Sequence, residues 1–402
     1  METAQDVEKL VQERSATLST APNLYVVNLP AGDTPGFDID ISGWTGNQRK
    51  MSSTEWLSQG YDGILFKGQG KTKTRIRPMA DTNVFVGSHN GIIAFESLTL
   101  GCRSFVGKGK ALHMGFENSH GPVREKFKAI LRDVEIDAEG PVVWGLFGYQ
   151  NDWELQDVYF NPSMFQSHEH GLYAHGFAKT GATFHNVRID GIGAEALKFT
   201  ARPTECKFVP NILVHIKNCV FKNWFNPVTS WRGGAGLVAQ ASTAHFVIED
   251  TYYWGNQTDY NRSKCVMIDG NGTGDYNSIT GEVGTAGPYN GHVILKRVAM
   301  TGATGPAWYT PIMRVGNNSG AVGPHCARSF LMEECGVYGK FRQIQIHGSM
   351  GDAFKGPGLI KNCNTPQIRD FLSAAGMNVN DEARIDTGGF PPVSQGLVIA
   401  KD

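Results

Sequence analysis

The sequence predicts an all-β protein in which parallel strands wind into a solenoid, and a repeated six-residue pattern is the main observation behind this prediction. The pattern reads apolar, polar, Asn or Asp, small apolar, any residue, apolar. Its spacing runs from 24 residues (positions 131 to 155) to 47 residues (positions 248 to 295). A structural unit that repeats with insertions of variable length is typical of solenoids. The clearest copies are LRDVEI (131–136), LQDVYF (155–160), FHNVRI (184–189), IKNCVF (216–221) and IEDTYY (248–253), and weaker copies are FESLTL (95–100), LKRVAM (295–300), MEECGV (332–337) and IKNCNT (360–365).

The second observation is a further strand that follows most copies after a loop. These segments alternate apolar with other residues at a period of two and are bounded by Gly, as strands are. No unit leaves room for a long helix, so we expect parallel coils that stack at the ordinary strand spacing of about 4.8 Å. Examples are HGLYAHG (170–176), ALKFTA (196–201), GLVAQA (236–241) and CVMIDG (265–270).

The Asn or Asp of each copy lies where the chain is predicted to bend between two strands. Both residues tolerate the left-handed backbone conformation and form hydrogen bonds with local backbone groups. Asn186, Asn218 and Asn362 are therefore expected to stack as an amide ladder along the solenoid. The small apolar residue that follows, such as Val187 or Cys219, is expected to stack in the interior.

These features resemble a right-handed parallel β-helix of the pectin-lyase-like superfamily. The segment GILFKGQGKTKTRIRP (63–78) is also similar to an early coil of that group, in which a Gly-x-Gly turn precedes Thr-x-Ile. The resemblance covers roughly residues 22 to 370. It implies the fold and a carbohydrate groove, but not one activity, because the superfamily includes lyases, hydrolases, epimerases, esterases and non-enzymatic spikes.

The amino-acid composition narrows the classes of molecule that the protein could bind. The chain has 402 residues with 49 Gly, 19% charged residues and a net charge of −1. This balance argues against a nucleic-acid footprint or a polybasic membrane surface. No apolar run approaches the length of a membrane span.

Three regions are predicted along the chain. Residues 1–21 are expected to form an N-terminal capping helix with an apolar face, residues 22–370 the β-helix, and residues 371–402 a C-terminal cap. The helix would cover the open strand edge at the first coil. The N-terminus shows no signal peptide as written, yet the resemblance implies an extracellular or virion-associated protein. The apolar face of the helix consists of Ala4, Val7, Leu10 and Val11.

The second strand of each coil provides the candidate site. If apolar pairs such as Leu172 and Ala174 point inward, the residues between and after them are expected to face solvent. In the superfamily, this strand face is the usual floor of the carbohydrate groove. Glu195 shares the inward parity of Leu197, so it is expected in a turn. The catalytic candidates are Tyr173, His175, Lys198 and Glu169, and the substrate-binding candidates are Thr200, Arg202, Gln240, Asp269, Trp231 and Arg232.

Two kinds of polysaccharide cleavage suit this face. A lyase takes the C5 proton of a uronic acid with a side-chain base, while a cation or Ca²⁺ neutralises the sugar carboxylate. A glycosidase needs two carboxylates about 5–9.5 Å apart. Bases and cations (His175, Lys198, Arg202) outnumber paired carboxylates, so elimination on an acidic polysaccharide is favoured over hydrolysis. No metal-binding motif is assigned, although Ca²⁺ remains compatible with the lyase chemistry.

The competing class is a non-catalytic viral tailspike or adhesin that holds host surface glycan, often as a homotrimer. Such a protein would use the same solenoid and bind polysaccharide without releasing product. A lyase product would instead absorb ultraviolet light, because elimination leaves a conjugated double bond.

Overall fold

The computed structural model describes most strands of the chain and the segments that join many of them. The described residues are 4–17, 22–35, 37–39, 49–51, 60–77, 84–86, 91–103, 109–115, 127–139, 142–161, 170–191, 195–200, 209, 211–222, 235–240, 244–255, 264–269, 291–302, 312–315, 327–339, 343–346, 357–386 and 397–400.

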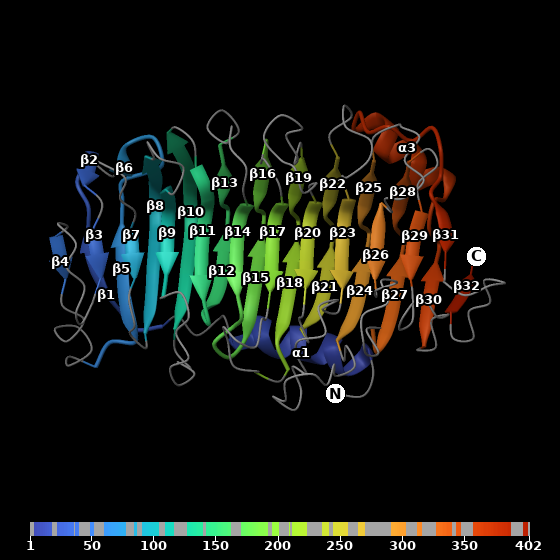
Figure 1. Ribbon diagram of the computed structural model, residues 1–402, viewed down its shortest axis with the longest axis horizontal. Coiled ribbons are helices and arrows are strands. Elements are labelled where there is room, and N and C mark those ends of the chain that lie inside the picture. The colour runs from blue at the N-terminus through green and yellow to red at the C-terminus, as the bar shows by residue number, and fades with distance from the viewer. Residues whose placement is uncertain are drawn as a thin grey trace.

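The described chain is dominated by parallel strands that stack coil upon coil along one axis (Figure 1). Most coils contribute a first and a second strand to a sheet of 20 described strands, here called sheet A, and a third strand to a sheet of 12 described strands, sheet B. Strands of one coil pair in parallel with the equivalent strands of the next, as β15 does with β18. This arrangement is consistent with the predicted parallel β-helix.

The first strands of the coils are β1 (Leu24–Asn28), β5 (Gly63–Lys67), β12 (Asp152–Gln156), β15 (Gly181–His185), β18 (Leu213–Lys217), β21 (His245–Glu249), β24 (His292–Lys296), β27 (Ser329–Glu333), β30 (Gly358–Lys361) and β32 (Leu397–Ala400). The second strands are β2 (Gly32–Pro35), β6 (Thr74–Arg77), β13 (Tyr159–Phe160), β16 (Arg188–Asp190), β19 (Val220–Lys222), β22 (Tyr252–Trp254), β25 (Ala299–Thr301) and β28 (Gly336–Tyr338). Two long strands, β8 (Ile92–Arg103) and β10 (Lys128–Glu139), supply both positions in their coils.

Sheet B contains the third strands. They are β3 (Phe37–Ile39), β4 (Arg49–Met51), β7 (Val84–Val86), β9 (Gly109–Met114), β11 (Val142–Tyr149), β14 (His170–His175), β17 (Glu195–Thr200), β20 (Ala235–Gln240), β23 (Lys264–Asp269), β26 (Met313–Val315), β29 (Gln343–Ile346) and β31 (Arg384–Asp386).

The bend between first and second strands confirms the conformation predicted for the repeated pattern. The third residue of all nine copies of the pattern has a positive φ between 49° and 56°. Asn and Asp adopt this conformation at low cost, and six of the nine positions carry one of them. The other three carry Ser97, Arg297 and Glu334, so stacking on neighbouring coils holds the bend even where the residue type does not favour it. The nine residues are Ser97, Asp133, Asp157, Asn186, Asn218, Asp250, Arg297, Glu334 and Asn362.

The residue after the bend is buried in eight of the nine copies, as predicted, and in the ninth copy Cys363 is half-buried. Val134, Val158, Val187 and Cys219 are all at most 1% exposed. At several coils the backbone N–H of this residue donates to a small polar side chain one coil further on. Val187 N donates to Cys219 Sγ at 3.4 Å, and Cys219 N donates to Thr251 Oγ1 at 3.3 Å. A buried donor that the bend takes out of the sheet is thereby satisfied.

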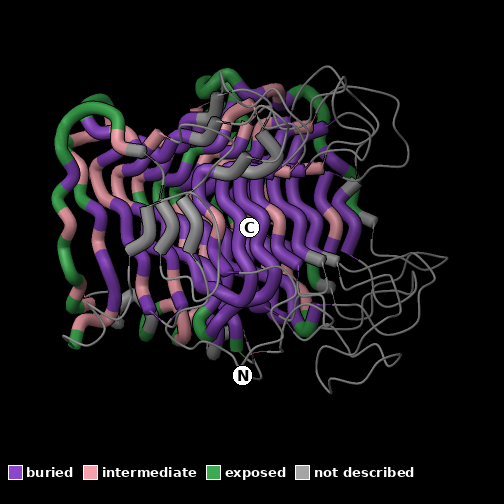
Figure 2. Tube along the Cα trace, turned by 60° about the vertical axis from the view of Figure 1, so that its left-hand side comes forward, coloured by how far each residue is buried: buried purple, intermediate pink, exposed green. Residues whose placement is uncertain are grey.

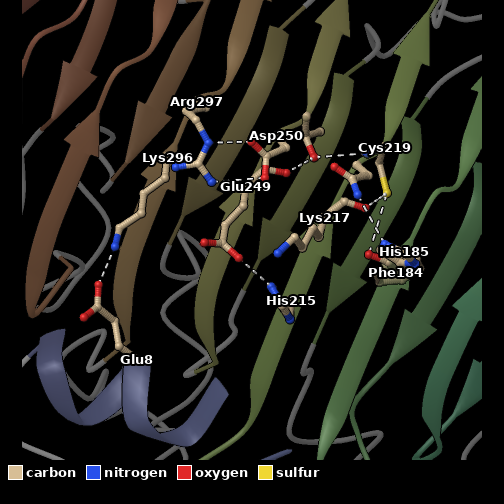
Figure 3. A network of polar contacts seen from close by, with 12 residues as sticks. Glu8, Phe184, His185, His215, Lys217, Cys219, Glu249, Asp250, Lys296 and Arg297 are labelled. Carbon is tan, nitrogen blue, oxygen red and sulfur yellow. Dashed lines mark hydrogen bonds and ion pairs between the residues drawn. The ribbon is translucent and has the colours of Figure 1, made fainter. Parts of the chain in front are cut away.

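The continuous amide ladder predicted for the bends is wrong. Asn186 and Asn218 do lie at the same bend on adjacent coils, but Asn186 Nδ2 donates to Asp157 Oδ1 and Asn218 Nδ2 lies 3.2 Å from His185 Nε2. The coils between Asn218 and Asn362 carry Asp250, Arg297 and Glu334 at the bend, so no run of amides exists there. Charge pairs replace it, as in Figure 3, where Arg297 binds both carboxylate oxygens of Asp250.

Helix α1 (Ala4–Thr17) does not cap the first coil, which corrects the predicted position of the N-terminal helix. It lies along the side of the solenoid beside the middle coils (Figure 1). Val7 is fully buried against Leu213, Val247 and Ile294, and Glu8 pairs with Lys296 (Figure 3). The predicted apolar face is therefore used, but it covers an apolar stripe on sheet A. At the N-terminal edge of sheet B lies β4, which pairs with β3.

Replacing Val7 with Asp is expected to release α1 from the solenoid. The change exchanges a fully buried apolar contact for a charge, so docking of the helix should lose at least about 2 kcal/mol. Hydrogen exchange of residues 4–17, followed by mass spectrometry, measures the loss. Gln12→Asp places the same side chain on the exposed face of the helix and should keep protection. Equal protection in both variants would show that the described contact does not hold α1.

The C-terminal segment continues both sheets. Strand β31 pairs with β29 in sheet B and β32 pairs with β30 in sheet A. Helix α3 (Pro366–Ala374) lies between β30 and β31. Its N-cap is Thr365, whose hydroxyl accepts a hydrogen bond from Ile368 N, and Leu372 on its apolar face is buried. Within the described residues, no helix is long and apolar enough to cross a membrane.

Buried polar groups also fix the turn that follows β14. The Asp152 carboxylate accepts hydrogen bonds from the backbone N–H groups of Ala178, Lys179, Thr180 and Gly181, and from the Thr180 hydroxyl. Asp152 is 3% exposed, and these hydrogen bonds offset much of the free-energy cost of burying its carboxylate. The turn therefore holds the end of β14 at a fixed place against sheet A.

Candidate functional site

The outer face of sheet B at β14 and β17 gathers the densest cluster of aromatic and titratable side chains predicted from the sequence. The pairing of these strands sets Tyr173 beside Lys198 and His175 beside Thr200, as predicted. Tyr173 packs in an aromatic cluster separate from the solenoid core, whereas Leu172 and Ala174 belong to the core. The predicted facing of these residues is therefore correct.

A local break in the alternation brings two further residues to the outer face, and the predicted position of one of them, Glu195, is wrong. Ala196 and Leu197 are consecutive and both lie in the core. A Cβ on Gly171, the residue equivalent to Ala196 in the previous coil, would lie 3.1 Å from the core residue Ile189. The side chains of the residues that precede Gly171 and Ala196, which are His170 and Glu195, therefore lie on the outer face of sheet B. Glu195, expected in a turn, instead lies in strand β17 on the outer face.

Glu195 and His170 complete the cluster. His170 Nδ1 lies 2.6 Å from Glu195 Oε2, and Lys198 Nζ lies 4.0 Å from Glu195 Oε1. The Lys198 ammonium also lies 4.9 Å from the ring centroid of Tyr173, at cation–π distance. The carboxylate orients both His170 and Lys198, which is how a third group positions a base or a cation in many active sites.

His175 holds the other end of the cluster. Its Nδ1 lies 3.1 Å from the Thr200 hydroxyl, and its ring centroid lies 4.1 Å from that of Tyr173. The same ring stacks on Tyr149 at 4.7 Å. Phe147 contacts Tyr173 as well, so an aromatic wall borders the cluster on the side of β11. On the side of β20, Val238 forms an apolar border.

The expectation that this face is open to solvent is wrong for the described side chains. Tyr173 is 9% exposed, His175 4% and Thr200 3%. Figure 2 shows the central strands as mostly buried, with more intermediate and exposed residues at the left-hand side and at the turns. One cause is the short distance between coils, because rings on neighbouring strands cover one another as Tyr149 and His175 do. The cluster is therefore a largely desolvated site in which charges interact more strongly than in water.

Electrostatics keep Glu195 ionised. Burial alone would raise its pKa, but His170, Lys198 and Lys264 together hold the pKa below the usual value of 4.5. An ionised carboxylate cannot donate a proton, so Glu195 is unsuited to be the general acid of a glycosidase. It is suited to orient the imidazole of His170 and the ammonium of Lys198.

The remaining predicted residues divide into two groups. The backbones of Gln240 and Asp269 continue the row of Thr200 through β20 and β23, since Thr200 pairs with Gln240 and Gln240 with Asp269. Their side chains lie outside the described part of the structure. Glu169, Arg202, Trp231 and Arg232 also lie outside the described residues. Among the residues that the structure describes, no group of three or more His, Cys, Asp or Glu is placed to hold a metal ion, so Ca²⁺ is assigned to none of them.

Comparisons of the chain with protein-family models, curated proteins and solved structures found no match. The chemistry of the cluster on sheet B is therefore the basis for assigning a function.

The lowered pKa of Glu195 predicts a pH-dependent contribution to stability. A carboxyl whose pKa is depressed on folding stabilises the protein above its unfolded pKa, near 4.5, and this contribution disappears as the pH falls through the folded pKa. Denaturant unfolding of the wild type and Glu195→Gln should differ most near neutral pH, with the gap closing below about pH 4.5. A gap that stays constant with pH would show that ionised Glu195 makes no such contribution.

Proposed function

We propose that this protein is a right-handed parallel β-helix that cleaves an acidic polysaccharide along the outer face of sheet B. Handedness follows from the general rule that connections between parallel strands of one sheet are right-handed in about 98% of cases. The stacked bends and strands support the likeness to the pectin-lyase-like superfamily. The single observation that carries the functional proposal is Lys198, held between the Glu195 carboxylate and the Tyr173 ring beside two histidines.

Elimination is the reaction that these groups suit best. Lys198 neutralises the carboxylate of a bound uronic acid, which makes the C5 proton more acidic. In its neutral form His170, held beside Glu195, takes this proton as general base. The electron pair forms the C4–C5 double bond, the C4–O bond breaks, and the Tyr173 hydroxyl protonates the leaving oxygen. His175 remains hydrogen-bonded to the Thr200 hydroxyl, and its ring packs against the ring of Tyr173.

Hydrolysis fits the described residues less well. A glycosidase requires two carboxylates on either side of the scissile bond, one of them protonated. The carboxylate that the structure describes within this cluster is Glu195, which is ionised and engaged with His170 and Lys198. The binding-only alternative, a tailspike or adhesin, uses the same surface without turnover.

A panel of glycans tests the proposal directly. The panel includes polygalacturonate, alginate, hyaluronate and neutral polysaccharides, and each reaction is read for new reducing ends and for ultraviolet absorbance. Release of reducing ends together with absorbance from acidic glycans supports elimination. Reducing ends without absorbance would replace it with hydrolysis, and binding without product would replace it with a spike or adhesin.

A further inference from the structure

A pocket of about 590 Å³ lies on a different face from the cluster on sheet B, between helix α3 and the second strands of sheet A. Its size falls within the range of small-molecule sites. Its lining includes Tyr252, Phe371, Asp250, Arg297, Glu334 and Asn362.

The floor of the pocket is shaped by a column of residues that become smaller from coil to coil. Tyr252 pairs with Ala299, and Ala299 pairs with Gly336. Helix α3 closes over the glycine, because a Cβ on Gly336 would lie 2.4 Å from Leu372 Cδ1. The space beside Tyr252 and Ala299 is left as the hollow. Phe371 on α3 faces this hollow with its ring 6.3 Å from Tyr252, and it is 57% exposed.

The opposite edge of the pocket is polar because it is built from bend residues of four successive coils. Asp250, Arg297, Glu334 and Asn362 follow one another along this edge. The Arg297 guanidinium donates to both oxygens of Asp250, and its side chain is still 48% exposed. The edge therefore offers carboxylate acceptors, guanidinium donors and an amide, with an excess of one negative charge.

We propose that this pocket binds a neutral saccharide. A sugar ring has apolar C–H faces, which fit the aromatic rings of Tyr252 and Phe371, and hydroxyl groups around its rim, which fit mixed donors and acceptors. An anionic ligand is disfavoured, because Asp250 already neutralises Arg297 and Glu334 adds a further negative charge. The pocket is separate from the cluster on sheet B, so this proposal does not depend on the proposed polysaccharide cleavage.

Saturation-transfer NMR on the full-length chain tests this site with maltose, lactose and cellobiose as probes. N-acetylneuraminic acid and putrescine serve as anionic and cationic comparisons. We expect at least one disaccharide to bind, with a Kd on the order of 1 mM. Phe371→Ser should weaken it at least about fivefold by removing the aromatic face. Phe371→Tyr, which keeps the ring, should bind as the wild type does. Phe371 is exposed, so neither change should disturb the fold.

Arg297→Asn is the second variant in this binding test. Asn retains the left-handed bend that position 297 requires, while the guanidinium is lost. Binding should again weaken at least about fivefold, whereas Gln12→Asp on the exposed face of α1 should leave it unchanged. The proposal is overturned if no disaccharide binds, if binding survives both Phe371→Ser and Arg297→Asn, or if only putrescine or N-acetylneuraminic acid binds.

Discussion

Replacing Val187 with Asp is expected to unfold most of the protein or to prevent its accumulation in soluble form. Val187 is fully buried, directly after the left-handed bend at Asn186, and belongs to the continuous core that runs through the coils. An Asp side chain there would be charged without a partner, or would fold only after taking up a proton. A loss of at least about 4 kcal/mol in the free energy of unfolding is expected, measured by denaturant unfolding.

The chain itself supplies a matched control for this change. Thr251 occupies the equivalent position two coils further on, where its hydroxyl accepts a hydrogen bond from Cys219 N and donates one to Glu249 O. Val187→Thr can make the same two kinds of hydrogen bond with neighbouring backbone groups, so it should cost about 1–2 kcal/mol, well below the cost of Val187→Asp. If Val187→Asp were as stable as Val187→Thr, the interior position of this residue would be wrong.

The bends could be predicted from the sequence because their cause is local. Asn and Asp adopt the left-handed conformation more readily than other residues with side chains. Their recurrence before a small residue therefore marked six of the nine bends, and the surrounding apolar positions marked the weak copies at Ser97, Arg297 and Glu334. The outward direction of Tyr173, His175 and Lys198 followed from strand alternation alone.

The position of Glu195 was missed because alternation fails at one place in each coil. A signal was present in the sequence: a small residue precedes the first inward apolar residue at Gly171, Ala196, Gly236 and Cys265. At Ala196 and Cys265 the core contains both this small residue and the next one. Recognition of this column of small residues would have predicted Glu195 on the outer face instead of in a turn.

The docking of α1 could not be predicted, because it depends on contacts far apart in the sequence. The spacing of Val7, Leu10 and Val11 indicates an apolar face, but not what it covers. The complementary stripe forms only when residues such as Leu213 and Ile294 are brought together by stacking of the coils. The burial of Tyr173 and His175 has the same origin, since rings from adjacent coils cover one another.

Replacing Lys198 with Ala should cost at least about 100-fold in turnover, the usual scale for removing a group that stabilises developing charge. The side chain lies outside the core, against Glu195 and Tyr173, so its loss should leave the coils intact. Lys222→Ala is the matched control. Lys222 Nζ also lies 4.9 Å from the centroid of an aromatic ring, that of Trp254, but on a strand of sheet A.

The most direct test of the central claim is the rate at which the wild type, Lys198→Ala and Lys222→Ala release unsaturated oligosaccharide from the acidic glycan that the wild type cleaves. Thermal unfolding of all three checks that the fold is retained. The account predicts a loss of at least about 100-fold in Lys198→Ala and a rate within about twofold of the wild type in Lys222→Ala. Full activity in Lys198→Ala, or an equal loss in both variants, would contradict the assignment of the reaction to the outer face of sheet B.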